Sequence, residues 1–234
     1  MDSGVLDTLL GGFLAIAGGA AVFWLERRAA REDSRREKLE LQGAKLLSMI
    51  VNIQQMHAWN TTIGRSIDEC FESVDDPNGE IEPGLKVLPI IIPDVAPRAF
   101  SSDELGFAFS TADTGLLEKL LSLATNFSAN LQTLREFNEI RKGHMAFVQA
   151  NATHGDFFDG EAASVEIPHA KKHQHESNVV MLNQLVALLL DSTTRDAKNC
   201  IETLERLRTA ANSIKGLKVP IVSFVEMRTK HANS

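Results

Sequence analysis

Residues 5–25 read VLDTLLGGFLAIAGGAAVFWL, and this stretch decides how the rest of the chain is arranged. Its one charged residue is Asp7, and the run ends abruptly at Glu26-Arg27-Arg28. A helix with a rise of ~1.5 Å per residue would span roughly 31 Å here, about the thickness of the hydrocarbon core of a bilayer. Soluble helices of this length normally keep a polar face, and this run has none. The sequence therefore predicts a transmembrane anchor over residues 1–25.

The orientation of this anchor follows from the charges around it. A cleavable signal peptide is the alternative interpretation, but it requires a basic segment before the apolar run, and Met1–Leu6 contains no Lys or Arg. The basic residues follow the run instead: Arg27, Arg28, Arg31, Arg35, Arg36 and Lys38. By the positive-inside rule, we expect a single-pass protein of the plasma or inner membrane, with its N-terminus outside and its C-terminal domain in the cytoplasm.

Small residues recur at helical spacing inside the apolar run. Gly11, Ala15 and Gly19 are four residues apart, so they share one face of a helix. Such a face lets a second helix approach closely, and van der Waals packing then drives association in lipid. We expect this face to support a homo-oligomer; the alternative is that small residues are simply common in membrane helices.

The charged segment 26–45 contains no Pro or Gly before Gly43, so the anchor helix can continue into the cytoplasm. Arg28, Arg31, Arg35 and Lys38 share a face at helical spacing. This face could contact anionic lipid headgroups, at about 1 kcal/mol per residue near the surface. The alternative interpretation is a solvated face that only fixes the topology.

Residues 46–234 have the pattern of a helical bundle. Apolar residues keep a helical period in three long segments, which predicts helices over about 4–73, 113–149 and 169–215. Asn60 and Thr193 are polar exceptions within the first and third stripes. The predicted fold is all-α: a single transmembrane helix continuous with a cytoplasmic antiparallel bundle of three long helices, plus short extended segments.

Between the long helices we expect short connecting pieces. Residues 85–93 are apolar but contain two prolines, which predicts an extended segment across the bundle, with an edge strand as the alternative. Ser101 or Ser102 can cap a short helix that ends near Phe109. Residues 151–168 lack periodicity and predict a loop. The apolar residues 219–225 could lie against residues 85–92.

Composition and motifs exclude several classes of function. The net charge of −7 argues against nucleic acid as a partner. Cys70 and Cys200 are too far apart in sequence for a metal-ligand pair and are expected to be buried thiols in a reducing compartment. The chain contains no phosphate-binding glycine loop, no GxSxG and no HExxH, so we expect no cofactor and no catalysis.

One histidine cluster is the exception to this absence of motifs. His169, His173 and His175 lie in the segment HAKKHQHE, and the first two would share a helix face that could hold a metal ion. The preceding loop could supply a further ligand from Asp156, Asp159 or His154. Two adjacent lysines oppose a cation, so a solvated helix start is the alternative interpretation.

Together these patterns predict a membrane-anchored protein that acts through contacts with other proteins. It would be a scaffold, a signalling subunit or a component of a membrane complex, with partners that the sequence does not identify. The alternative is a membrane-anchored metal-binding protein or metal-dependent enzyme that uses the histidine cluster.

Overall fold

The computed structural model describes residues 3–76, 79–91, 97–111, 113–151, 166–217 and 219, with the side chains of the first helix described from Phe23 onward. These ranges contain five helices: α1 (Ser3–Ser73), α2 (Pro83–Lys86), α3 (Ser102–Phe109), α4 (Leu116–Asn151) and α5 (His169–Asn212). No residue in the described ranges lies in a β-strand. The prediction of an all-α protein with three long helices is confirmed.

The first helix has the predicted extent, because α1 runs without a break for 71 residues. In the part of the chain whose side chains are described, no helix carries an apolar segment long enough to cross a membrane. The predicted anchor up to Val22 lies outside that part, and so does the predicted packing face of Gly11, Ala15 and Gly19.

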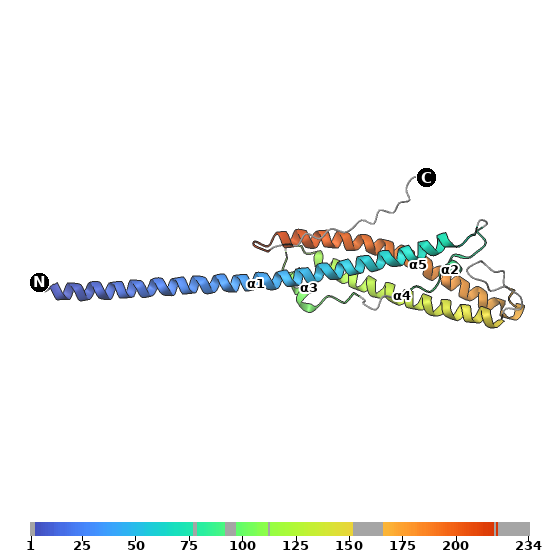
Figure 1. Cartoon of the computed structure of the whole chain (residues 1–234), viewed down its shortest axis with the longest axis horizontal. Coiled ribbons are helices and arrows are strands. Elements are labelled where there is room, and N and C mark those ends of the chain that lie inside the picture. Colours follow the sequence, from blue (N-terminus) through green and yellow to red (C-terminus); the bar gives the residue numbers. More distant parts are fainter. Residues whose placement is uncertain are drawn as a thin grey trace, which may run out of the picture.

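Helix α5 is the central element of the bundle, because it packs along both α1 and α4 (Figure 1). Gly64 of α1 lies next to Thr193, and Gly43 lies next to Leu217 beyond the end of α5, so these two helices are antiparallel. Helix α4 is also antiparallel to α5. Consequently α1 and α4 run in the same direction, so the predicted antiparallel arrangement holds for α5 against each of them but is wrong for α1 against α4. The chain between them returns along the length of the bundle before α4 begins.

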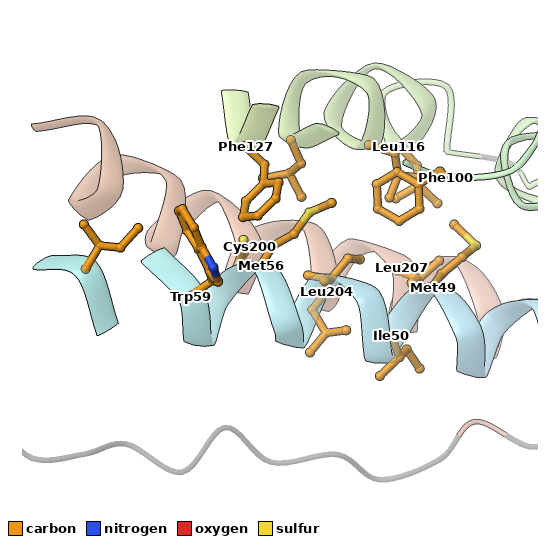
Figure 2. Close-up of a cluster of buried hydrophobic side chains, with 14 of the residues drawn as sticks. Met49, Ile50, Met56, Trp59, Phe100, Leu116, Phe127, Cys200, Leu204 and Leu207 are labelled. Carbon is orange, nitrogen blue, oxygen red and sulfur yellow. The ribbon is translucent and has the colours of Figure 1, made fainter. Parts of the chain in front are cut away.

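The predicted apolar stripes meet in one core, part of which is drawn in Figure 2. Met49, Ile53 and Ile67 of α1 are at most 2% exposed, as the helical period predicts. Trp59 packs edge-on against Phe127 of α4, with 5.0 Å between the ring centroids. Each fully buried aliphatic or aromatic side chain stabilises the fold by about 1.5–3 kcal/mol. This burial is what holds the second half of α1 to α4 and α5.

Asparagine side chains fasten the returning segment to the helices. Asn138 of α4 accepts a hydrogen bond from the backbone N–H of Ile90 and donates one to its carbonyl, both at 2.8 Å. Asn52 of α1 pairs with the backbone of Arg98 in the same way, at 2.8 and 3.1 Å. Each carboxamide thus makes the pair of N–H and C=O hydrogen bonds that a neighbouring β-strand would otherwise make with this residue. Residues 87–91 form neither helix nor strand, so the alternative edge strand is wrong there, and Val87 is extended as predicted. Leu85 and Lys86 of the predicted extended segment lie instead in α2.

The short helix α2 was not predicted and depends on α5. The Asn183 side chain accepts from the N–H of Gly84 at 2.6 Å and donates to Glu82 at 2.8 Å. A Cβ atom at Gly84 would lie 2.6 Å from the carbonyl carbon of Leu182, so only glycine permits this close approach. The Arg141 guanidinium also donates to the carbonyls of Leu85 and Val87, at 2.8 and 3.0 Å.

Helix α3 begins with the predicted serine cap. Ser101 accepts from the N–H of Glu104, and the Glu104 carboxylate accepts from the N–H of Ser101, which forms a capping box. Arg98 donates to both oxygens of Glu104, at 2.5 and 2.8 Å. Burial alone would raise the pKa of Glu104, but the hydrogen bonds from Arg98 and Ser101 outweigh it and lower that pKa to about 2.

The ends of α4 and α5 agree closely with the sequence. Asp113 accepts from the N–H of Gly115, as expected for a cap, and also binds Arg206 of α5 through both oxygens, at 2.6 and 2.9 Å. Helix α5 ends at Asn212, and Gly216 follows with a φ of 92°, which favours glycine. Residues 152–165 of the predicted loop and residues 220–225 of the predicted apolar pairing lie outside the described residues.

Candidate functional site

The first candidate is the arm of α1, which we define as residues 23–38. Every side chain in the arm is exposed, and burial against the bundle begins only at Leu39. Figure 1 shows this half of α1 extending well beyond the other helices. The arm lacks the apolar stripe of residues 46–73, so it has no face with which to join the core.

Aromatic residues stand at the beginning of the described part of the arm. Phe23 and Trp24 are 62% and 59% exposed. The guanidinium groups of Arg27 and Arg28 lie 6.0 and 5.6 Å from the centroids of these two rings. Each such cation–π contact contributes about 0.5–1 kcal/mol at an exposed site. This order, with aromatic rings followed by arginines, is typical of a helix that leaves a membrane on its cytoplasmic side.

The predicted basic face, Arg28, Arg31, Arg35 and Lys38, is exposed along the arm. Arg28 pairs with Glu32 at 3.1 Å, while the other three have no ion pair within the described residues. Exposed pairs of this i,i+4 type contribute only about 0.3–0.5 kcal/mol. The basic side chains are therefore accessible to an anionic surface. Lipid contact itself stays a prediction.

The three histidines of the predicted metal cluster do not share one environment. His169 and His173 are exposed, whereas His175 is half-buried. The His175 ring faces His144 of α4, with 5.0 Å between the ring centroids. Among the described residues, no group of three His, Cys, Asp or Glu side chains is placed to hold a metal ion. Asp156, Asp159 and His154 lie outside those residues, so the metal site on His169, His173 and His175 stays a prediction.

His144 is the residue that sequence reasoning missed. It is 2% exposed, and its ring also stacks on Phe147, with 6.2 Å between centroids. Neither ring nitrogen of His144 has a hydrogen-bond partner among the described residues, and the same holds for Nδ1 of His175. Burial, together with the nearby His175 and Arg141, lowers the pKa of His144 to about 4. The imidazole is therefore neutral at physiological pH.

A second buried polar group, which we call the Asn/Asp layer, joins the three long helices near the middle of the bundle. Asp196 of α5 is 1% exposed and accepts hydrogen bonds from Asn126 and Asn130 of α4, at 3.0 and 2.9 Å. Asn130 also donates to Asn60 of α1, at 3.3 Å. Because both Asp196 oxygens are engaged and shielded from water, this carboxylate is not available as a general base for a substrate.

The cysteines behave as small buried side chains. Both Cys70 and Cys200 are free thiols, and Cys200 is fully buried while Cys70 is partly buried against the core. Burial, with the charge of Asp196, raises the pKa of Cys200 to about 12. A thiol with so high a pKa is a poor nucleophile and a poor metal ligand.

A shallow depression lies on the outward face of α5. Six residues line it: His173, Glu176, Ser177, Val180, Met181 and Gln184. Val180 and Met181 are 55% and 42% exposed, and Leu188 continues the same face at 50%. An apolar patch rimmed by polar groups suits contact with another protein better than the enclosure of a small molecule.

Comparison with protein-family models, curated proteins and solved structures gave no match to this chain.

Proposed function

We propose that this protein is a single-pass membrane protein whose cytoplasmic helical bundle acts through contacts with other proteins. Residues 1–25 form the anchor, residues 26–45 the charged juxtamembrane helix and residues 46–234 the bundle. The N-terminus lies outside the plasma or inner membrane. In this proposal the bundle serves as a scaffold, a signalling subunit or a component of a membrane complex, and the face of Gly11, Ala15 and Gly19 joins two copies.

The observation that carries this proposal is the arm. A charged helix that leaves the bundle gains no stability from burial, because its side chains contact only water and one another. With a membrane anchor at its N-terminal end, the arm would act as a rigid spacer that holds the bundle at a fixed distance from the bilayer. The exposed aromatic and basic residues of the arm suit the interface between lipid and cytoplasm.

The contact surface that we assign to a protein partner is the outward apolar face of α5. The side chains of Val180, Met181 and Leu188 are exposed there. Burying their apolar surface against a partner would lower the free energy of the complex. They lie on the helix that is already fixed along its length by α1 and α4. A rigid helix with exposed apolar side chains can bind a partner without first becoming ordered.

Membrane insertion can be tested with matched charge substitutions. In the double variant Leu14→Arg/Ile16→Arg, each arginine costs about 2.5–3.5 kcal/mol at the centre of a spanning helix. We expect the wild type to resist extraction from membranes by alkaline carbonate and this variant to appear in the soluble fraction. Ala29→Arg/Ala30→Arg adds the same charge to the exposed arm and should remain in the membrane. A wild type that is soluble after lysis would refute the anchor.

The partner surface can be tested by crosslinking in native membranes followed by mass spectrometry. Leu188→Glu places a charge on the outward face of α5, whereas Thr194→Glu adds the same charge at another exposed position of that helix. We expect a crosslinked partner with the wild type and with Thr194→Glu, and a loss of at least tenfold with Leu188→Glu. Equal crosslinking by both variants would show that this face is not the contact.

A further inference from the structure

The pairing of His144 with His175 is energetically unusual. Imidazole nitrogens are strong hydrogen-bonding groups, and a buried polar atom without a partner costs about 1–3 kcal/mol. Three ring nitrogens of this pair are buried without a partner in the described part of the protein. The Asn/Asp layer shows that the same bundle can satisfy buried polar groups where it holds them. The two histidines therefore call for an explanation in terms of a ligand.

The chemistry of two neutral imidazoles narrows the class of ligand. A neutral imidazole offers one nitrogen lone pair, and it is the most common protein ligand for zinc and related transition-metal ions. An imidazole centroid lies roughly 3.2 Å from a metal ion bound to one of its nitrogens, so two rings of a tetrahedral site have centroids roughly 5 Å apart. The observed separation is 5.0 Å, with 35° between the ring planes.

We propose that His144 and His175 bind one zinc-class transition-metal ion, which links α4 to α5. The described residues provide these two ligands and no third His, Cys, Asp or Glu ligand. The two ligands come from facing helices near the C-terminal end of α4 and the N-terminal end of α5. This site differs from the exposed pair of His169 and His173, whose spacing along one helix suggested a metal.

The charges around the pair set an upper limit on its affinity. Arg141 lies one helical turn before His144 and carries a positive charge that opposes a cation. Its guanidinium donates to the carbonyl oxygens of Leu85 and Val87, whose dipoles face that charge and partly offset it. With two protein ligands and this neighbouring charge, we expect weak binding, so the occupancy of the site follows the concentration of free metal.

The test uses full-length protein purified without a histidine tag and stripped with a chelator. Zinc is then titrated while thermal unfolding is followed by circular dichroism. Zinc at tenfold above its Kd should raise the Tm by about 3–6 °C in a chain of this size. The double variant His169→Gln/His173→Gln removes the exposed pair and should keep the full shift. His175→Gln should lose the shift, and its metal-free Tm shows whether it is folded.

Cobalt provides a second measurement that does not depend on stability. Cobalt bound to two imidazoles gives visible absorption bands, which His175→Gln should abolish and the double variant should retain. Three results would overturn the proposal: no shift with zinc up to the millimolar range, a shift that survives in His175→Gln, or a shift that disappears in His169→Gln/His173→Gln. The last result would assign metal binding to the exposed pair instead.

Discussion

The Asn/Asp layer and the pair of His144 and His175 both place polar side chains between α4 and α5, but they differ in whether those side chains have hydrogen-bond partners. In the layer, Asp196 accepts two hydrogen bonds from α4, and Asn130 donates a third hydrogen bond to Asn60 of α1. In the histidine pair, three ring nitrogens have no partner among the described residues. The described residues therefore supply hydrogen-bond partners for the Asn/Asp layer but not for the histidine pair.

From this difference we infer a structural role for the Asn/Asp layer and a ligand-binding role for the histidine pair. The hydrogen bonds of the layer form only when three helices share one register, because a slip of α4 along α5 would separate the asparagine donors from Asp196. The layer therefore selects one packing of the bundle over others. The histidine pair forms no hydrogen bonds among the described residues that would fix the register of the helices. Its nitrogen lone pairs are therefore available to the metal ion proposed above.

The largest expected effect comes from breaking the layer. Asp196→Ala removes the acceptor of two amide donors, one from the buried Asn130 and one from the half-buried Asn126, so we expect the free energy of unfolding to fall by about 3–5 kcal/mol. Urea unfolding followed by circular dichroism measures this change. Asp191→Ala removes an exposed aspartate that pairs with Arg195 at 3.1 Å and should change the same quantity by less than about 0.5 kcal/mol. A similar small loss for both variants would mean that the layer does not stabilise the fold.

The next effect concerns pH and the histidine pair. Burial lowers the pKa of His144 from 6.5, the ordinary value of an imidazole, to about 4 in the folded protein, so the unfolded chain binds the proton more tightly. Stability is therefore complete above pH 6.5 and falls as the pH decreases towards 4, by up to about 3 kcal/mol. His144→Leu should reduce this fall in chelator-treated protein, and the part that remains comes from His57, whose pKa burial also lowers. Unfolding midpoints in urea at a series of pH values provide the measurement.

Glu104 defines a separate window and serves as an internal control. Its pKa is lowered from 4.5 to about 2, so its contribution is present above pH 4.5 and is lost as the pH falls towards 2. Wild type and His144→Leu should lose stability equally in this lower window. If His144→Leu has the same slope as the wild type between pH 6.5 and 4, the buried imidazole is not the source of the acid sensitivity.

The smallest effect is expected where a polar side chain serves the backbone of the returning segment. Asn138→Ala removes two hydrogen bonds to Ile90, so we expect a loss of about 1–2 kcal/mol, measured by urea unfolding. Gln132→Ala, at an exposed position of the same helix, should be neutral or slightly stabilising, because alanine is the better helix former. A neutral Asn138→Ala would mean that water replaces the side chain without cost.

The long helices could be predicted because their signals are local. The period of Met49, Ile53 and Ile67 fixed one face of α1, and Asp75-Asp76-Pro77 marked its end. The polar exceptions were visible too, since Asn60 and Thr193 interrupted the stripes. Their partners were not predictable, because helical phase identifies the buried face of a helix but not the residue that faces it from another helix. His144 was missed for this reason.

The returning segment could be predicted only in outline. Its prolines excluded a central strand, but the side chains that hold it, Asn52, Asn138 and Asn183, come from three separate helices. Pro83 suits the first position of α2, but that single turn is fixed by Asn183 and by the close approach of Gly84 to α5, which the sequence around residues 82–91 does not reveal. Long-range contacts of this kind override local propensity.

The central place of α5 also governs how the chain can fold during synthesis. Helices α1 and α4 contact α5 far more than they contact each other, and α5 is the last of the described helices to be made. At about 5–20 residues per second, the ribosome needs roughly 7 to 28 seconds between the end of α1 and the end of α5. Throughout that interval the apolar face of α1 lacks its main partner. The nascent chain is therefore most exposed to aggregation, and most dependent on chaperones, until α5 emerges.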